Sequence, residues 1–196
     1  MTRTPPDPVH HLTRRETLAA GGSLATLALA GCTSLTGGET PAAVSLAGGL
    51  QCDNCGMVVE KHPGPNGQVF FADESPEGHE NPARFDALKQ CLFPYTMERE
   101  QRGWTVEAVY VTDYSKVDYD VSGDGQPRRS YISSHVAPES FALAEDLYYV
   151  VESDIRGAMG QDFVPFSVES DAEAFVDEYG GRVVRYDDIG PALVGK

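Results

Sequence analysis

The chain has 196 residues, with 30 aspartates and glutamates against 15 lysines and arginines, so its formal net charge at pH 7 is −15. A field of this sign repels nucleic acid and anionic lipid headgroups, which excludes a nucleic-acid-binding protein. Arginine outnumbers lysine, as is typical of halophilic archaeal proteins. We therefore interpret the acidity as adaptation of the whole surface to salt rather than as one acidic binding site.

The first 31 residues have the order of an export signal. Arg14 and Arg15 precede an uncharged, apolar run over residues 18–30, and Leu29-Ala-Gly-Cys32 closes the segment. The run is shorter than the ~20 residues that a membrane-spanning helix needs, which favours a cleaved segment. An N-terminal core helix, the alternative, leaves the paired arginines and the cysteine unexplained. We predict a twin-arginine lipoprotein signal peptide over 1–31, with lipid on Cys32 holding the protein at the outer face of the cell membrane.

Residues 32–49 are mostly Thr, Ser, Gly, Ala and Pro, so a flexible tether is expected there. Residues 50–196 have the length and apolar content of one compact domain. Its first half predicts short strands at 58–59 and 69–72, joined by a turn rich in Gly and Pro. A helix follows over 82–92, with Asn81 as its cap and Pro82 in its first turn. Branched and aromatic side chains predict a further strand over 104–113.

The second half predicts a solvated acidic loop over 114–129, because the residue order of a calcium-binding EF-hand is missing. A strand is expected over 147–152 and a helix over 171–179, with Ser170 and Glu173 forming a capping box and Gly180 ending the helix. A last strand is expected over 182–186. Each half places a methionine beside a glycine, ahead of a strand and a helix. This weak repeat predicts equivalent places for Met57 and Met159.

Three sulfur-bearing side chains lie within the segment Cys52-Asp-Asn-Cys-Gly-Met57. If Cys32 carries lipid, the odd number of remaining cysteines prevents complete pairing within one chain. Zinc would need the pair, Cys91 and a histidine, whereas a redox dithiol would be expected in a βαβ context that is missing here. A thioether is a poor zinc ligand and a good ligand for Cu(I). We therefore favour Cu(I) bound by Cys55 and Met57, with Cys52 and Met159 as further candidates.

The remaining candidates for ligands have weaker support. Cys91 falls near Leu88 and Leu92 on the expected helix, so we interpret it as an inert core thiol. Among the three histidines of the expected domain, His62 in the Gly/Pro-rich turn is better placed to complete the site than His79 and His135.

Several segments together resemble the NosL family of copper-binding lipoproteins. They are Cys52-Asp-Asn-Cys-Gly-Met57, Phe71-Ala-Asp73, Val111-Thr-Asp-Tyr114, and Tyr149-Val-Val-Glu-Ser153 leading to Ala158-Met-Gly160 and Phe166. The resemblance implies an α+β domain of two related strand–strand–helix units, similar to the organomercurial lyase fold. It also implies copper ligation by Cys55 and Met57, with Met159 as an additional or relay ligand.

The same resemblance implies an extracytoplasmic Cu(I) chaperone, not an enzyme. Such a chaperone supplies copper to nitrous oxide reductase, an enzyme of denitrification, and works with an ABC-type membrane assembly complex. Two alternatives stay open from the residues themselves. One is an enzyme acting through thiols, either in disulfide exchange or in organomercurial cleavage, and the other is a structural zinc-binding module.

Overall fold

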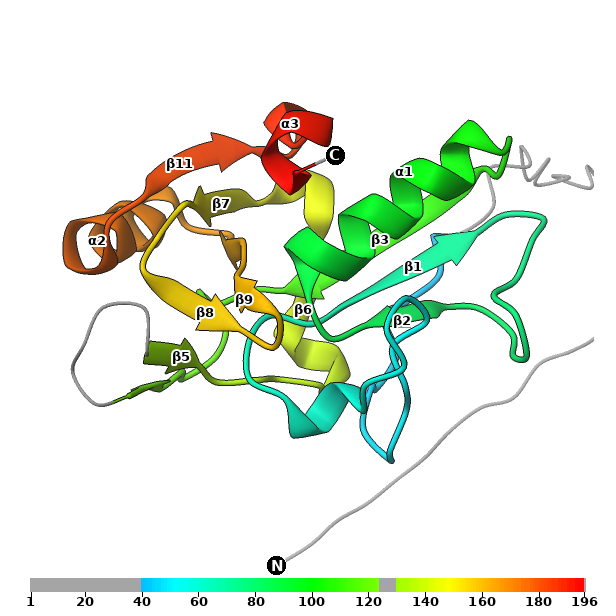
Figure 1. The fold of residues 1–196 in the computed structure, drawn as a ribbon, viewed down its shortest axis with the longest axis horizontal. Coiled ribbons are helices and arrows are strands. Elements are labelled where there is room, and N and C mark those ends of the chain that lie inside the picture. The colour runs from blue at the N-terminus through cyan, green and yellow to red at the C-terminus, as the bar shows by residue number, and fades with distance from the viewer. Residues whose placement is uncertain (1–39, 124–129, 196) are drawn as a thin grey trace, which may run out of the picture. The chain divides into compact units, whose positions relative to one another are not determined.

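The computed structural model describes residues 40–123 and 130–195 (Figure 1). The predicted signal peptide, the lipidation site Cys32 and most of the expected tether lie outside these residues. The end of the tether does not match the expectation of a flexible segment, because Leu46 is fully buried and its N–H donates to the Val136 carbonyl (2.9 Å). Val44 exchanges two hydrogen bonds of 2.9 Å with the Gln68 side chain. The packed domain therefore includes Val44 and Leu46, which precede the expected boundary at residue 50.

The first sheet has four antiparallel strands in the order β2-β1-β3-β6. They are β1 (Gly67–Phe71), β2 (Ala83–Phe85), β3 (Val106–Thr112) and β6 (Phe141–Leu143). β1 lies between β2 and β3 and is buried along its whole length. A π-helical turn over Leu88–Leu92 leads into α1 (Phe93–Gln101), which runs along this sheet (Figure 1).

The helix predicted over 82–92 is therefore wrong in its first half, where the chain forms β2. Asn81 does not cap a helix: its side-chain amide donates to the Phe71 and Glu74 carbonyls (2.8 and 2.9 Å) and accepts the Phe71 N–H (3.2 Å). The strand predicted at 58–59 is also wrong, since Val58 makes only an isolated bridge and Val59–Lys61 forms a 3-10 turn, η1. Hydrophobic periodicity does not reveal these outcomes because they depend on hydrogen bonds between a side chain and the backbone, or between two backbone segments.

The second half repeats the connections of the first. Its sheet has the order β10-β7-β11, from β7 (Tyr148–Val151), β10 (Val164–Phe166) and β11 (Arg182–Arg185), with α2 (Glu169–Tyr179) between the last two. In both sheets the first strand pairs with the second and the third, and a helix precedes the third. The strands predicted near 69–72, 104–113, 147–152 and 182–186 are confirmed, as is an α+β domain.

Two further predictions, the equivalence of the methionines and the capping box of the second helix, are wrong. Met57 precedes β1 whereas Met159 follows β7, so the methionines do not occupy equivalent places. In α2 the N-cap is Val168, no side chain caps the helix, and Ser170 lies inside its first turn, so the predicted capping box is absent from this described helix. Gly180, with φ of +73°, ends the helix as expected.

A third small sheet joins the two halves of the chain. Its order is β4-β5-β8-β9, from β4 (Val121–Ser122), β5 (Ser130–Ile132), β8 (Ile155–Gly157) and β9 (Gly160–Gln161), with β5 and β8 parallel. The short helical turns are η3 (Pro138–Ser140), η4 (Ala144–Asp146), η5 (Tyr186–Asp188) and α3 (Pro191–Val194). β4 interrupts the expected 114–129 loop, of which residues 124–129 lie outside the described part. None of the described helices is long and apolar enough to cross a membrane.

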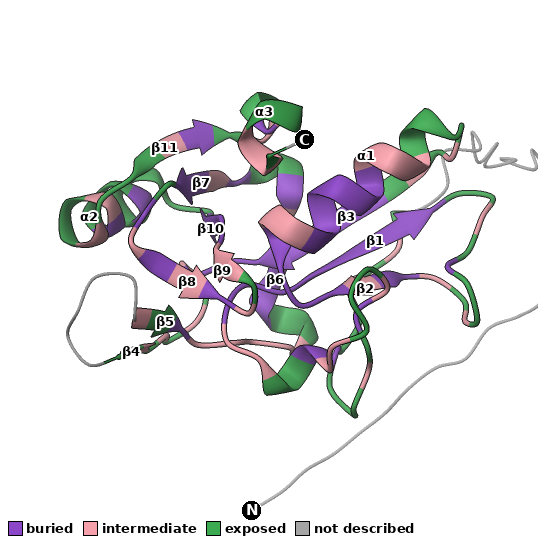
Figure 2. Ribbon diagram, viewed as in Figure 1, coloured by how far each residue is buried: buried purple, intermediate pink, exposed green. Residues whose placement is uncertain are grey.

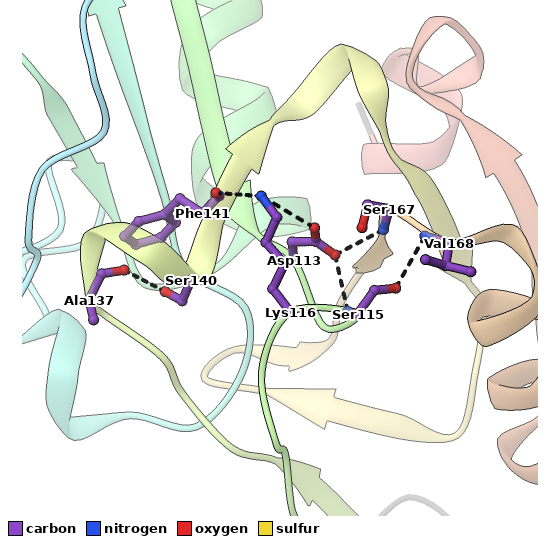
Figure 3. Close-up of polar contacts among 8 residues, drawn as sticks. All are labelled: Asp113, Ser115, Lys116, Ala137, Ser140, Phe141, Ser167 and Val168. Atoms are coloured by element: carbon purple, nitrogen blue, oxygen red, sulfur yellow. Dashed lines mark hydrogen bonds and ion pairs between the residues drawn. The ribbon is translucent and has the colours of Figure 1, made fainter.

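A buried carboxylate fastens the end of β3 to the start of α2 (Figure 3). Asp113 accepts the N–H groups of Ser115 (3.0 Å) and Ser167 (2.9 Å), and its own N–H donates to the Ser140 carbonyl (2.8 Å). The Ser115 hydroxyl in turn accepts the Val168 N–H (3.2 Å). Backbone N–H groups thus solvate a charge that burial would otherwise make unfavourable.

β7 contributes one face to each of the two hydrophobic cores. Tyr149 packs into the larger core with Phe93 and Phe163, while Val150 packs into the smaller core with Phe166 and others. Strand alternation explains this division, because successive side chains point to opposite faces. The buried parts of β1, α1 and β7 lie toward the middle of the domain, whereas α2 and α3 expose much of their surface (Figure 2).

Candidate metal centre

A tight loop over residues 51–58, the metal loop, carries the Cys-x-x-Cys-Gly-Met motif. Gln51 and Val58 form a bridge at its base, and within it the Cys52 N–H donates to the Met57 carbonyl (2.8 Å). The Gly56 N–H donates back to the Cys52 carbonyl (2.8 Å), and Gly56 has φ of +77°, a conformation that favours glycine. The glycine between the second cysteine and the methionine therefore allows the loop to close.

Further hydrogen bonds fix this loop to β2 and to the turn before α1. The Asp53 N–H donates to the Arg84 carbonyl (2.9 Å), and the Asp53 carboxylate accepts the Arg84 N–H (2.6 Å). The Asn54 side chain donates to the Gln90 carbonyl (3.2 Å). The two residues between the cysteines thus bring the thiols to the segment 86–91.

Three thiols and a carboxylate meet at this point. The ligand atoms of Cys52, Cys55, Asp86 and Cys91 all lie within 4.8 Å of one another, and Cys55 Sγ is 3.3 Å from Asp86 Oδ1. Three of these residues are at most 3% exposed, whereas Cys55 is exposed. Ligands that share one ion at bond lengths near 2.3 Å lie about 4 Å apart. The cluster could therefore bind one metal ion with little rearrangement.

The two candidate methionines differ in their relation to the cluster. Met159, in the turn between β8 and β9, places its sulfur 3.5 Å from Cys91 Sγ and is 43% exposed. Met57 is half-buried in the metal loop, where its carbonyl accepts the Cys52 N–H. Met159 thus joins the thiols directly at the exposed edge of the cluster, and thioether ligation by Met57 stays a prediction.

The protonation of the thiols follows from their mutual contacts. The Cys91 thiol hydrogen-bonds to Cys52, which lowers the pKa of Cys52 and, together with burial, raises that of Cys91. Burial, assisted by Cys52 and Asp86, raises the pKa of the Cys55 thiol to about 12. A metal ion must therefore displace protons from Cys55 and Cys91, so metal affinity should increase with pH.

Asp86 has the environment of an available ligand. Its side chain is fully buried, and its Oδ2 atom has no hydrogen-bond partner within the described ranges 40–123 and 130–195. Buried carboxylate oxygens normally have partners. A bound cation would satisfy this oxygen.

A second buried carboxylate holds the Met159 turn against the helix that carries Cys91. Asp162 accepts the N–H groups of Leu88 (3.1 Å), Lys89 (2.7 Å) and Phe163 (2.8 Å). It thereby caps the turn before α1 from a position 74 residues later in the chain than Leu88. Asp162 therefore positions both Met159 and Cys91.

The histidines do not complete this cluster among the described residues. His79 binds the Asp53 carboxylate through Nε2 (2.7 Å) and the Glu80 carbonyl through Nδ1 (2.7 Å). His135 lies 3.0 Å from the Ser133 hydroxyl, and burial lowers its pKa. A zinc site completed by histidine is therefore not supported.

Sequence reasoning found Cys52, Cys55 and Met159 as neighbours and missed two members of the cluster. Cys91 is buried, as expected of a core thiol, but it lies among the other thiols of the cluster, so it is available as a ligand. The sequence pattern does not predict Asp86 as a ligand. A signal for Asp86 is present in the sequence: this carboxylate lies close to Cys91 in the segment that leads into α1.

An α+β domain that gathers three free thiols beside an exposed loop, with a methionine at the edge of the cluster, has a ligand set that could bind a soft metal ion. The NosL family model matches residues 43–194. The chain belongs to the NosL family.

Individual relatives agree with this assignment. The chain is 27% identical over 152 residues to the copper-binding lipoprotein NosL of Stutzerimonas stutzeri, covering 74% of this chain and 64% of the relative. It is 32% identical over 143 residues to that of Achromobacter cycloclastes, covering 71% and 63%. The chain thus spans somewhat less than two thirds of the length of these relatives.

A solved structure shares the fold. The crystal structure of the copper chaperone NosL from Shewanella denitrificans superposes with a TM-score of 0.59 at 29% identity, covering 79% of this chain and 98% of that one. The relatives are described as copper-binding lipoproteins and as a copper chaperone, and none of these descriptions is that of an enzyme.

Proposed function

We propose that this protein is a Cu(I)-binding metallochaperone, not an enzyme, held by a lipid on the outer face of the membrane. The observation that carries the proposal is the contact between a cluster of three thiols, two of them buried, and the exposed thioether of Met159. Thiolates and thioethers are the ligands that Cu(I) prefers. An exposed thioether beside buried thiols suits an ion that must be received and released by ligand exchange.

Metal selectivity tests this proposal directly. In anaerobic titrations against a chromophoric Cu(I) chelator, the purified protein should bind one equivalent of Cu(I), and Zn(II) should not displace it. The sulfur-rich ligand set is the physical reason. Zn(II) displacing Cu(I) would overturn the proposal in favour of the zinc module, which the carboxylate of Asp86 supports as a second candidate.

The copper-receiving protein is proposed from the family resemblance and from the description of relatives as copper-binding and copper-chaperone proteins. We propose nitrous oxide reductase as the client and an ABC-type membrane complex as the assembly partner. Copper-loaded protein should transfer its metal to copper-free nitrous oxide reductase when that complex is present. Equal transfer from free Cu(I) and from the loaded protein would contradict this assignment.

A thiol-dependent enzyme is the alternative that the sequence left open. The three described cysteines have free thiols, and the pKa of two of them is raised. Protonated thiols are poor nucleophiles at neutral pH. The pKa of the third thiol, Cys52, is lowered, but this side chain is only 3% exposed, which limits its access to a disulfide or organomercurial substrate. Protonation of two thiols and burial of the third favour metal binding over disulfide exchange or organomercurial cleavage.

A further inference from the structure

A groove of about 550 Å³ adjoins the metal loop. One wall is the loop itself, including Cys52 and Gly56. The opposite side is formed by Arg84 of β2 and by Tyr95 and Arg99 of α1. A segment bound in this groove would therefore contact the loop that carries Cys52 and Cys55.

Two arginines in this groove lack acidic partners. Neither Arg84 nor Arg99 forms an ion pair in the part of the chain that the structure describes, whereas Arg102 pairs with Glu98 and Arg182 with Glu152. The chain has twice as many acidic as basic side chains, 30 against 15, so unpaired arginines beside its metal loop need an explanation.

Arg99 is also held in place before any ligand binds. Its guanidinium lies 4.4 Å from the centre of the Tyr95 ring and 4.9 Å from that of the Trp104 ring. Its Nε atom is buried and has no hydrogen-bond partner among the described residues. Stacking on aromatic rings fixes the planar guanidinium and leaves it ready to bind a carboxylate.

The acidic residues of the groove do not neutralise these arginines. Asp53 is engaged by the His79 ring through Oδ1 (2.7 Å) and by the Arg84 backbone N–H through Oδ2 (2.6 Å). Glu77 is exposed and forms no ion pair with either arginine. The guanidinium groups therefore keep free donors for an external acceptor.

We propose that this groove binds an acidic segment of the protein that exchanges copper with this chain. Carboxylates of that segment pair with Arg84 and Arg99, because guanidinium and carboxylate groups form paired, charge-assisted hydrogen bonds. The segment's own sulfur ligand then reaches Cys55 across Gly56, an exposed position with open space where a side chain would lie. The inference rests on the proposed function, since it specifies the partner at the same site.

The single tryptophan of the chain provides the measurement, because Trp104 contacts Arg99. The probe is the acetylated, amidated hexapeptide Asp-Glu-Asp-Glu-Gly-Met, and the control peptide has Asn and Gln in place of Asp and Glu. We expect the acidic peptide, but not the control, to change Trp104 fluorescence in a saturable way. Increasing salt should weaken the binding, because exposed charge pairs are screened.

Substitutions locate the binding site. Arg84→Gln combined with Arg99→Gln should lower peptide affinity at least ~10-fold, whereas Arg102→Gln, at an arginine outside the groove, should leave it within ~2-fold. Arg84→Gln alone should lower it as well, and this variant keeps the packing of Arg99 on its two rings. Thermal unfolding of each variant verifies that it is folded.

Several results would overturn the docking proposal. They are the absence of saturable binding, equal binding of the neutral peptide, and undiminished binding to both the double and the Arg84 variants. Displacement of the acidic peptide by inorganic phosphate at equal concentration would also overturn it, because it would indicate a small-anion site. The Cu(I) affinity of the double variant should stay within ~3-fold of the wild type. Cu(I) binding without peptide binding would refute the groove alone, and peptide binding without Cu(I) binding would refute the metallochaperone.

Discussion

Replacing Cys91 with serine is expected to lower the Cu(I) affinity of the protein about 100-fold, equivalent to ~2.7 kcal/mol. Cys91 Sγ belongs to the thiol cluster and contacts the Met159 sulfur. Serine has nearly the same size and can still donate a hydrogen bond, so the fold should survive. What is lost is a soft ligand, because a hydroxyl binds Cu(I) poorly.

This substitution separates two ligand sets. Cu(I) held by Cys55, Met57, Cys52 and Met159, as expected from the sequence, leaves Cys91 without a role. Cu(I) held by the cluster in the structure requires it. Affinity is measured by competition with a chromophoric chelator, and X-ray absorption should show one sulfur fewer around copper in the variant.

Matched substitutions complete the experiment. Cys55→Ser should reduce affinity at least as much as Cys91→Ser, since Cys55 lies in the same cluster and is the exposed thiol. Met97→Leu, at a half-buried methionine of α1 outside the cluster, should leave affinity unchanged. Wild-type affinity in Cys91→Ser, with the sulfur count also unchanged, would show that Cys91 is not a ligand.

The stability of the protein is expected to decrease between about pH 4 and pH 7 because of Asp162. Burial raises the pKa of this carboxyl from its ordinary value of 3.8 to about 7, against the opposing effect of the three N–H groups that it accepts. The folded state therefore keeps a proton that the unfolded chain has released. This contribution to stability is complete below about pH 4 and is lost as the pH rises through about 7. Its upper limit is roughly 4 kcal/mol.

Asp162→Asn removes the titrating group and keeps an oxygen that can accept the N–H groups of Leu88 and Lys89. The free energy of unfolding, measured in urea at several pH values, should decrease less in this variant than in the wild type, by about 1 to 4 kcal/mol between pH 4 and pH 8. Asp177→Asn, at an exposed position of α2, should follow the wild-type curve. Parallel curves for wild type and Asp162→Asn would contradict the assignment.

The misplaced helix shows where local patterns stop being informative. Phe85, Leu88 and Leu92 have helical spacing, yet Phe85 belongs to β2 and the helical turn starts at Leu88. The side chain of Asn81 binds the backbone of Phe71, which holds this segment beside β1. These contacts join residues ten positions apart through a side chain and a backbone group, and hydrophobic periodicity carries no information about such hydrogen bonds.

By itself, the sequence determined the kind of chemistry and much of the framework. The residues of Cys52-Asp-Asn-Cys-Gly-Met57 place sulfur ligands and a turn-forming glycine within one short loop, so the preference for a soft metal depends only on side-chain type and spacing. Strands of branched and aromatic residues, and the glycine at the end of α2, likewise follow from local preferences.

Only the tertiary structure decided which residues surround the metal loop. Cys91 and Asp86 come from the segment between β2 and α1, Met159 comes from the turn between β8 and β9, and Asp162 fastens these two segments together. The same packing leaves Arg84 and Arg99 beside the loop. These residues are far apart in the chain, and only the burial of both cores and the hydrogen bonds of buried carboxylates bring their side chains together.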